Sequence, residues 1–126
     1  MSIALWCVLI AGLLPYVATG VTKIGGRNYD NNNPRAWLAR QEGFRARAHA
    51  AHQNSWEAFA LFTAAVLVSH AAHGPLPRVD TLAMVFIGAR LVYILMYVAG
   101  WGTLRSLVWT VGMVCTVWIF LAGGMR

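Results

Sequence analysis

Four apolar segments divide the chain, and each belongs to a predicted helix long enough to cross a lipid bilayer. They cover residues 1–22, a run that ends near Ala72, residues 80–100 and residues 103–122. A helix rises about 1.5 Å per residue, so about 20 apolar residues span a hydrocarbon core roughly 30 Å thick. The pattern predicts an all-α fold, an integral membrane four-helix bundle that forms a single domain over residues 1–126.

The polar stretches between these runs predict the connections. Residues 23–33 are rich in glycine and asparagine, which favour irregular structure. Asn33 and Pro34 have the form of a helix start, with asparagine as the N-cap and proline in the first turn. From Pro34 the sequence predicts one helix that is continuous with the second span. Residues 73–77 and 100–102 contain glycine, and the first of them also proline, which predicts short turns.

The composition excludes a water-soluble domain of this size. Hydrophobic residues make up 59% of the chain and charged residues only 11%, whereas soluble domains carry about a quarter charged residues. The net charge of +6 is not concentrated as in a nucleic-acid-binding protein, so no nucleic-acid partner is expected. Cys7 and Cys115 lie within apolar runs, which predicts small packing residues. Neither a disulfide framework nor a metal site is predicted.

Lysine and arginine are distributed unevenly between the two sides of the predicted bundle. The connections before the second and fourth spans carry Lys23, Arg27, Arg35, Arg40, Arg45, Arg47 and Arg105. The opposite side carries only Arg78 and Arg126. Positive residues favour the cytoplasmic side, so the first long connection is expected in the cytoplasm and both termini outside. No basic residue precedes Lys23, which favours an uncleaved first helix over a signal peptide.

Polar residues continue from the first connection into the second span. On a helix, Arg47 and Asn54 share one stripe, and Glu57 lies a small step away. The roughly opposite stripe consists of Arg45, His49, His52 and Trp56. A carboxylate at membrane depth is costly without a partner. These residues either cap a helix at the water interface or form a polar site between helices.

A second charge, Arg90, interrupts the third span about 15 Å along its helix. It shares one helical face with Tyr93 and Tyr97, which is typical either of an aromatic packing stripe or of a surface that faces a ligand. Opposite charges at membrane depth favour a polar site between helices. We therefore expect Glu57 or a ligand carboxylate to pair with Arg90. Arg105 lies in the first turn of the fourth span, as an interfacial anchor or as part of this site.

Together these residues resemble the membrane-associated proteins in eicosanoid and glutathione metabolism, the MAPEG family. The resemblance covers nearly the whole chain, with four spans, a long cytoplasmic first connection and external termini. Its motifs are His52-x-Asn54-x-x-Glu57, Arg90-x-x-Tyr93-x-x-x-Tyr97 and Arg105.

The resemblance implies a homotrimer with glutathione, and no metal, bound between neighbouring subunits near the cytoplasmic face. Asn54 and Glu57 would hold the glutathione backbone, Tyr93 and Tyr97 would contact it, and Arg105 would stabilise the thiolate. The candidate glutathione-binding residues are Arg47, His52, Asn54, Glu57, Arg90, Tyr93 and Tyr97, with Arg105 as the catalytic residue.

The chain departs from the family pattern at two positions. Family enzymes usually carry an arginine where Ala50 stands, and Arg47 could substitute for it only in part. The family also favours a proline at the position of Ala60, which concerns helix shape. The first departure bears on the affinity for glutathione.

The resemblance implies a bacterial-type, glutathione-dependent transferase or peroxidase that acts on hydrophobic electrophiles arriving from membrane lipid. Its expected location is the bacterial inner membrane. One alternative is a non-enzymatic binding or regulatory protein on the same scaffold, which Ala50 favours. A less favoured alternative is a small proton-coupled transporter with Glu57 as the proton carrier.

Overall fold

The computed structural model describes residues 1–122, and the part it describes is helical without strands. Its long helices are α1 (Ile3–Lys23), α3 (Phe44–His73), α4 (Pro77–Ala99) and α5 (Gly102–Ala122), and a short helix α2 (Pro34–Ala39) lies between the first two. All four long helices are long and apolar enough to cross a membrane. The chain is therefore an integral, multi-pass membrane protein with the predicted four-helix architecture.

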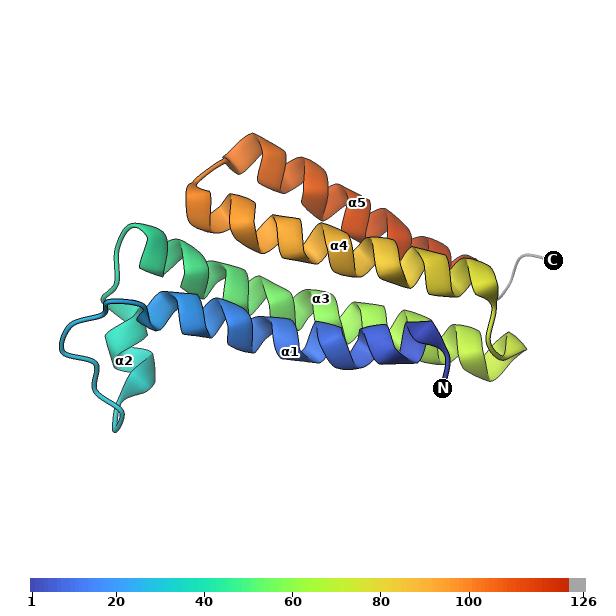
Figure 1. Cartoon of the computed structure of the whole chain (residues 1–126), viewed down its shortest axis with the longest axis horizontal. Coiled ribbons are helices and arrows are strands. Elements are labelled where there is room, and N and C mark those ends of the chain that lie inside the picture. The colour runs from blue at the N-terminus through green and yellow to red at the C-terminus, as the bar shows by residue number, and fades with distance from the viewer. Residues whose placement is uncertain (123–126) are drawn as a thin grey trace.

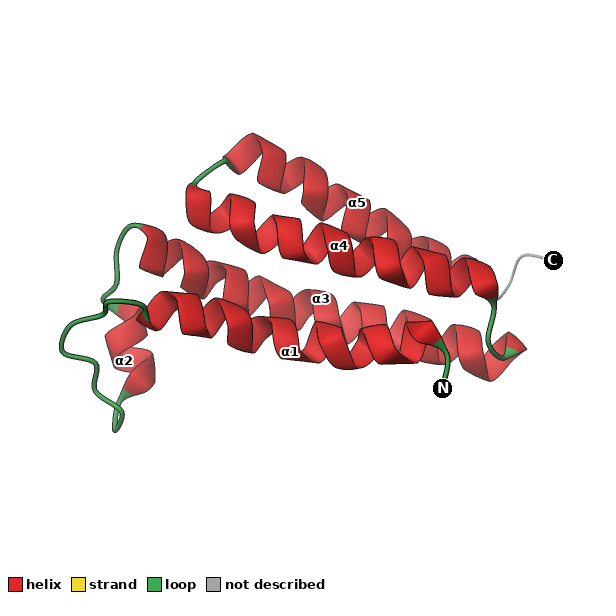
Figure 2. Ribbon diagram, in the orientation of Figure 1, coloured by secondary structure: helices red, strands yellow, loops and turns green. Residues whose placement is uncertain are grey.

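The long helices run up and down alongside one another (Figure 1). Helix α1 packs mainly on α3, and α4 mainly on α5. One end of the bundle, here called the loop end, carries α2 with its flanking loops and the short α4–α5 turn (Figure 2). The opposite end, here called the terminal end, holds the start of α1 and the α3–α4 connection.

The second span does not continue from Pro34, so this part of the prediction is wrong. Helix α2 starts at Pro34 as predicted but ends at Ala39, and α3 begins only at Phe44. Gly43 precedes α3 with a φ of 64° and a ψ of −139°, a conformation that breaks a helix and that glycine adopts without steric cost. Asn33 occupies the N-cap position without a capping hydrogen bond, and its side-chain amide nitrogen donates to Asp30.

The terminal end holds an apolar core. The rings of Phe62 and Phe86 stack there with centroids 4.0 Å apart. The buried members of this cluster are Ala4, Cys7, Ala11, Phe62, Ala65, Val66, Val79, Ala83, Phe86, Cys115, Ile119 and Ala122. Both cysteines are unpaired and buried in it, which confirms their prediction as small packing residues.

Polar contacts fix the start of α1 at this end. The Ala4 backbone N–H donates to the Asp80 carboxylate at 2.8 Å, and the Ser2 hydroxyl lies 2.7 Å from the His70 ring nitrogen Nε2. The first N–H groups of a helix lack partners within the helix. The Asp80 carboxylate supplies a partner for one of them, and the two contacts together hold α1 against α3 and α4.

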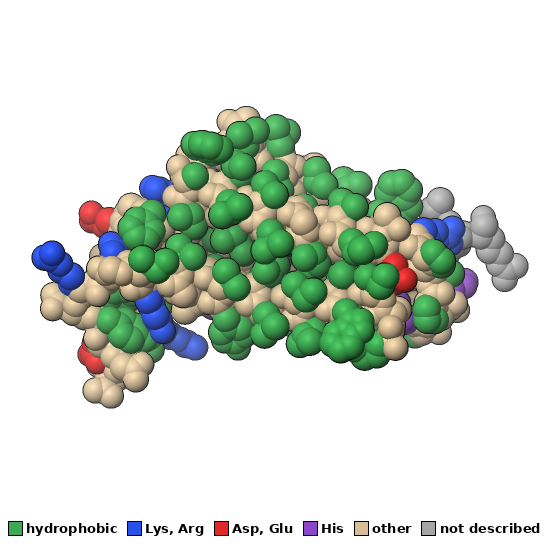
Figure 3. Space-filling view, viewed as in Figure 1, with side chains coloured by type: hydrophobic (Ala, Val, Ile, Leu, Met, Phe, Trp, Pro, Cys, Tyr) green, Lys and Arg blue, Asp and Glu red, His purple; other side chains and the backbone are tan. Residues whose placement is uncertain are grey.

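A smaller cluster lies nearer the loop end, made of Leu14, Ala18, Ala51, Tyr93 and Ile94. On the outer surface of the bundle, large apolar side chains are widely exposed, as the space-filling view shows (Figure 3). Such a surface is typical of helices covered by lipid or by neighbouring subunits.

Candidate functional site

A polar cavity of about 420 Å³ opens between α3, α4 and α5 in the half of the bundle nearer the loop end. This volume lies in the range of about 300–1,000 Å³ that is usual for small-molecule sites. The residues that line it are Asn54, Tyr93, Tyr97, Arg105, Ser106, Trp109 and Thr110.

The spacing of residues on α4 and α5 builds the walls of this cavity. Tyr93 and Tyr97 are one helical turn apart, and their rings meet edge to face with centroids 5.6 Å apart. Gly100 ends α4 in the left-handed conformation at a φ of 82°, which turns the chain sharply into α5. The turn brings Arg105, in the first turns of α5, beside Tyr97.

Arg105 is held by an aromatic ring and keeps its hydrogen-bond donors free. Its guanidinium carbon lies 4.3 Å from the centroid of the Tyr97 ring, a cation–π contact. Within residues 1–122 its side chain donates no hydrogen bond. An arginine stays charged at any working pH, so the cavity presents a permanent cation with unused donors.

Asn54 brings an unsatisfied amide to the same cavity. Its amide oxygen is buried and has no hydrogen-bond partner among the described residues. A buried polar group left without a partner costs roughly 1–3 kcal/mol. The site therefore offers a ligand one amide to satisfy and one cation to neutralise.

Arg90 lies deeper in the bundle than the cavity and is almost completely buried, with 3% of its surface exposed. Its Nη2 donates to the Ser55 hydroxyl over a long 3.4 Å, and its guanidinium carbon lies 4.0 Å from the Tyr93 ring centroid. Among the described residues it forms no ion pair with Glu57, whose side chain is exposed. Pairing of Arg90 with a ligand carboxylate stays a prediction.

Two other predicted site residues point elsewhere. The Arg47 guanidinium donates to the Val98 carbonyl at 3.1 and 3.2 Å and so closes the C-terminal end of α4. The His52 ring nitrogen Nδ1 lies 2.7 Å from the Thr19 hydroxyl, on the α1 side of α3. Of the predicted residues, the structure thus brings together Asn54, Tyr93, Tyr97 and Arg105, and leaves Arg47, His52, Glu57 and Arg90 outside the cavity lining.

The sequence analysis missed Ser106, Trp109 and Thr110, which complete the cavity. Their signal was the helical spacing on the fourth span, because Trp109 follows Arg105 by one turn and Thr110 follows Ser106 by one turn. Ser55 was missed as well, although it lies one turn beyond the buried Ala51, to whose carbonyl its hydroxyl donates at 2.7 Å.

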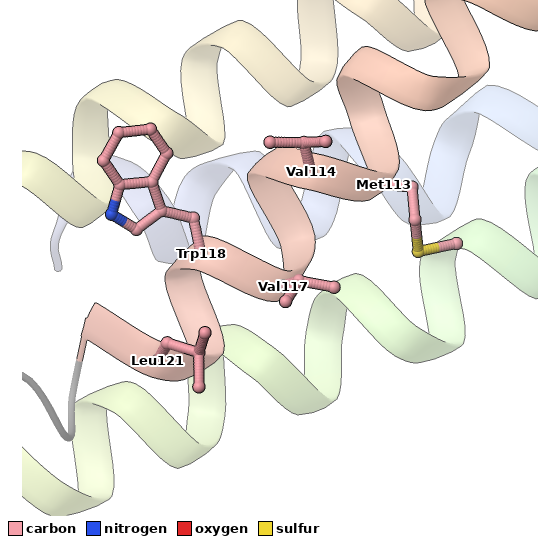
Figure 4. Close-up of a pocket in the computed structure, with 5 residues that line it drawn as sticks. All are labelled: Met113, Val114, Val117, Trp118 and Leu121. Atoms are coloured by element: carbon pink, nitrogen blue, oxygen red, sulfur yellow. The ribbon is translucent and has the colours of Figure 1, made fainter.

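A second cavity, of about 460 Å³, lies along α5 and has no polar side-chain cluster (Figure 4). Met113, Val114, Val117, Trp118 and Leu121 line it. Such a surface suits an acyl chain or another apolar helix and offers no group for catalysis. Within residues 1–122, no group of three or more histidine, cysteine or acidic side chains is placed to hold a metal ion.

Comparison with protein families identifies one that covers the chain. The model of the MAPEG family matches residues 3–125, nearly the whole chain. No curated protein and no solved structure matches it.

Proposed function

The chain belongs to the MAPEG family, and from this premise we propose that it is a membrane enzyme that uses glutathione against hydrophobic electrophiles. The observation that carries the proposal is the cavity between α3, α4 and α5, where Arg105 and Asn54 lack hydrogen-bond partners for their side chains. A peptide thiol with carboxylate and amide groups would supply both.

Arg105 is the proposed catalytic residue. A fixed positive charge beside a thiol favours the thiolate and lowers the thiol pKa. In the transferase reaction the thiolate sulfur forms a bond to an electrophilic carbon, the leaving group departs with its electron pair, and the thiol proton passes to water. With a peroxide as substrate, a second glutathione molecule would act as the reductant that completes the reaction.

The other cavity residues would bind and orient the thiol. Asn54 would exchange hydrogen bonds with the peptide part, and Tyr93 and Tyr97 would form the wall against which it lies. Arg90 contacts the ring of Tyr93 from the buried side, so its proposed role within the protomer is to position that wall. Binding to a ligand carboxylate would require the ligand to reach below Tyr93.

A homotrimer would complete the site. Glu57 is exposed on a helix long and apolar enough to cross a membrane. An unpaired carboxylate within a membrane is costly, and a neighbouring subunit would cover it. The basic residues at the loop end support a cytoplasmic cavity with both termini outside, in the bacterial inner membrane. Native mass spectrometry and crosslinking test the assembly, and a monomer or a dimer would contradict it.

A non-enzymatic role on the same scaffold is the second candidate. Arg47, the residue that could replace an arginine at Ala50, is already bound to the Val98 carbonyl. Among residues 1–122, Arg105 is then the one cation that lines the cavity, which favours binding of glutathione without efficient turnover, or binding of a different ligand.

Two measurements on purified protein in detergent separate these functions. Conjugation of glutathione to 1-chloro-2,4-dinitrobenzene is followed by absorbance for the parent and for Arg105→Ala. Calorimetry with glutathione measures binding independently of turnover. Binding with turnover that depends on Arg105 supports the enzyme, binding without turnover supports the non-enzymatic role, and absence of both contradicts the glutathione proposal.

A further inference from the structure

The connection between α1 and α3 is folded around one buried aromatic side chain. Trp37 of α2 is 2% exposed, and its indole nitrogen donates to the Arg27 carbonyl at 3.0 Å. Tyr29 packs edge to face on the indole with ring centroids 5.0 Å apart. At Gly26 an added Cβ would lie only 2.7 Å from the Trp37 ring, so the loop passes directly over it. The basic side chains on this segment therefore project from a fixed frame.

This frame is attached at the level where the apolar part of α1 ends. Lys23 lies in the last turn of α1, and its ammonium stands 4.7 Å over the Tyr29 ring. From the start of α3, the Arg45 guanidinium donates to the Ile24 carbonyl at 2.7 Å. An uncharged span that ends in a lysine places that lysine among the lipid headgroups.

Residues 23–45 carry a net positive charge, and most of their basic side chains face outward. Residues 23–45 contain five basic and two acidic residues, a net charge of +3. Lys23, Arg27, Arg35 and Arg40 are exposed, and basic side chains gather at this end of the molecule (Figure 3). One of the two acids, Asp30, is engaged within the loop, where it accepts hydrogen bonds from the Asn32 backbone and the Asn33 side chain.

We propose that residues 23–45 form a platform that binds the headgroups of anionic phospholipids in the adjoining leaflet. Clustered basic residues next to a membrane span are attracted to anionic lipid through their net positive charge. The platform extends from a membrane helix, so the lipid surface is its nearest partner at high local concentration. This binding is independent of any chemistry in the cavity near Arg105.

The test compares two lipids that differ only in headgroup. The full chain in neutral detergent is equilibrated with equal amounts of phosphatidylglycerol and phosphatidylcholine with identical acyl chains, and the retained lipids are measured by mass spectrometry. The parent should retain phosphatidylglycerol several-fold over phosphatidylcholine. The ratio should approach one in the variant Lys23→Gln/Arg27→Gln/Arg35→Gln/Arg40→Gln, and it should fall for the parent as salt is raised.

Two further variants keep the result interpretable. Arg27→Lys/Arg35→Lys/Arg40→Lys preserves the charge and should preserve the preference for phosphatidylglycerol. Arg35→Gln/Arg40→Gln changes only two exposed side chains of α2 and its end, leaves the Trp37 contacts intact, and should give an intermediate ratio. Unchanged ratios in both glutamine variants, or a parent that retains the two lipids equally, would overturn the proposal.

Discussion

The terminal end and the loop end of this bundle are built from the same four long helices but differ in packing and polarity. At the terminal end the helices meet through stacked rings and small side chains, and Phe62 and Val66 are fully buried. Nearer the loop end, the same helices enclose a cavity in which Asn54 and Arg105 have unused hydrogen-bonding capacity. One half is closely packed with apolar side chains, and the other half leaves polar groups without partners among the described residues.

Helix α3 contributes to both ends and changes from polar to apolar along its length. Its first turns, from Phe44 to Glu57, contain the charged and amide residues, whereas its later turns present Phe62, Ala65 and Val66 to the other helices. Unsatisfied polar groups at one end lower the stability of the ligand-free protein. The apolar packing at the terminal end has to offset this loss of stability, so the two ends should respond differently to mutation and to ligand.

The largest effect on stability is expected at the terminal end. Phe62→Ala removes a fully buried ring that stacks on Phe86, and it should lower the free energy of unfolding by about 3–5 kcal/mol. Denaturant titration in detergent measures this, with Leu61→Ala as the control because Leu61 is exposed. Below the melting temperature glutathione affinity should be unchanged, and a matching loss of affinity would show that the two ends are not separable.

The next effect concerns chemistry at the cavity. Arg105→Ala should lower turnover about 10²–10³-fold, the usual loss when one electrostatic donor is removed, and should raise the pKa of the bound thiol. Ultraviolet absorbance of the thiolate across pH measures that pKa. Arg105→Lys retains a positive charge, so it should keep part of the turnover and part of the lowering of the thiol pKa.

Binding of an analogue without a thiol is the control for Arg105→Ala and should change little. If the thiolate titrates identically in the parent and in Arg105→Ala, then Arg105 is an interfacial anchor and the catalytic assignment is wrong.

A smaller effect is expected at Asn54, and it should appear in binding alone. Asn54→Ala removes an amide whose oxygen is buried without a partner, so the ligand-free protein should not lose stability. The Kd for glutathione should rise about tenfold, which corresponds to one hydrogen bond of about 1.4 kcal/mol. Calorimetry measures the Kd and thermal unfolding measures the stability. Gln53→Ala is the control, since Gln53 is exposed. A clear fall in melting temperature without ligand would assign Asn54 a structural role.

The two ends also differ in how far the sequence predicts them. The four spans follow from the apolar segments and the helical pattern that continues them, and Asn54, Tyr93, Tyr97 and Arg105 follow from the motifs in which the chain resembles the MAPEG family. The break at Gly43 escaped prediction because a single backbone conformation, a φ of 64°, interrupts a sequence that otherwise favours helix. The positions of Arg47 and His52 escaped it because helical spacing gives the face of a residue and not the neighbour that the face meets.

The smallest effect is the most specific, and it concerns the boundary between the two ends. Arg90 is buried there with one long hydrogen bond to Ser55 and a ring contact to Tyr93. A buried charge without an ionic partner contributes little or negatively to stability, and hydrophobic replacement of buried charges is often neutral or stabilising. Arg90→Leu should therefore leave the ligand-free protein at least as stable as the parent while weakening glutathione binding. Ser55→Ala keeps the charge of Arg90 but removes the hydroxyl to which Arg90 donates. The free energy of unfolding should therefore fall by about 1 kcal/mol. Denaturant titrations of both variants, with and without glutathione, give the four values needed. A loss of stability for Arg90→Leu larger than that for Ser55→Ala would mean that Arg90 is paired in the assembled protein, and Glu57 of a neighbouring subunit would then be the first partner to test.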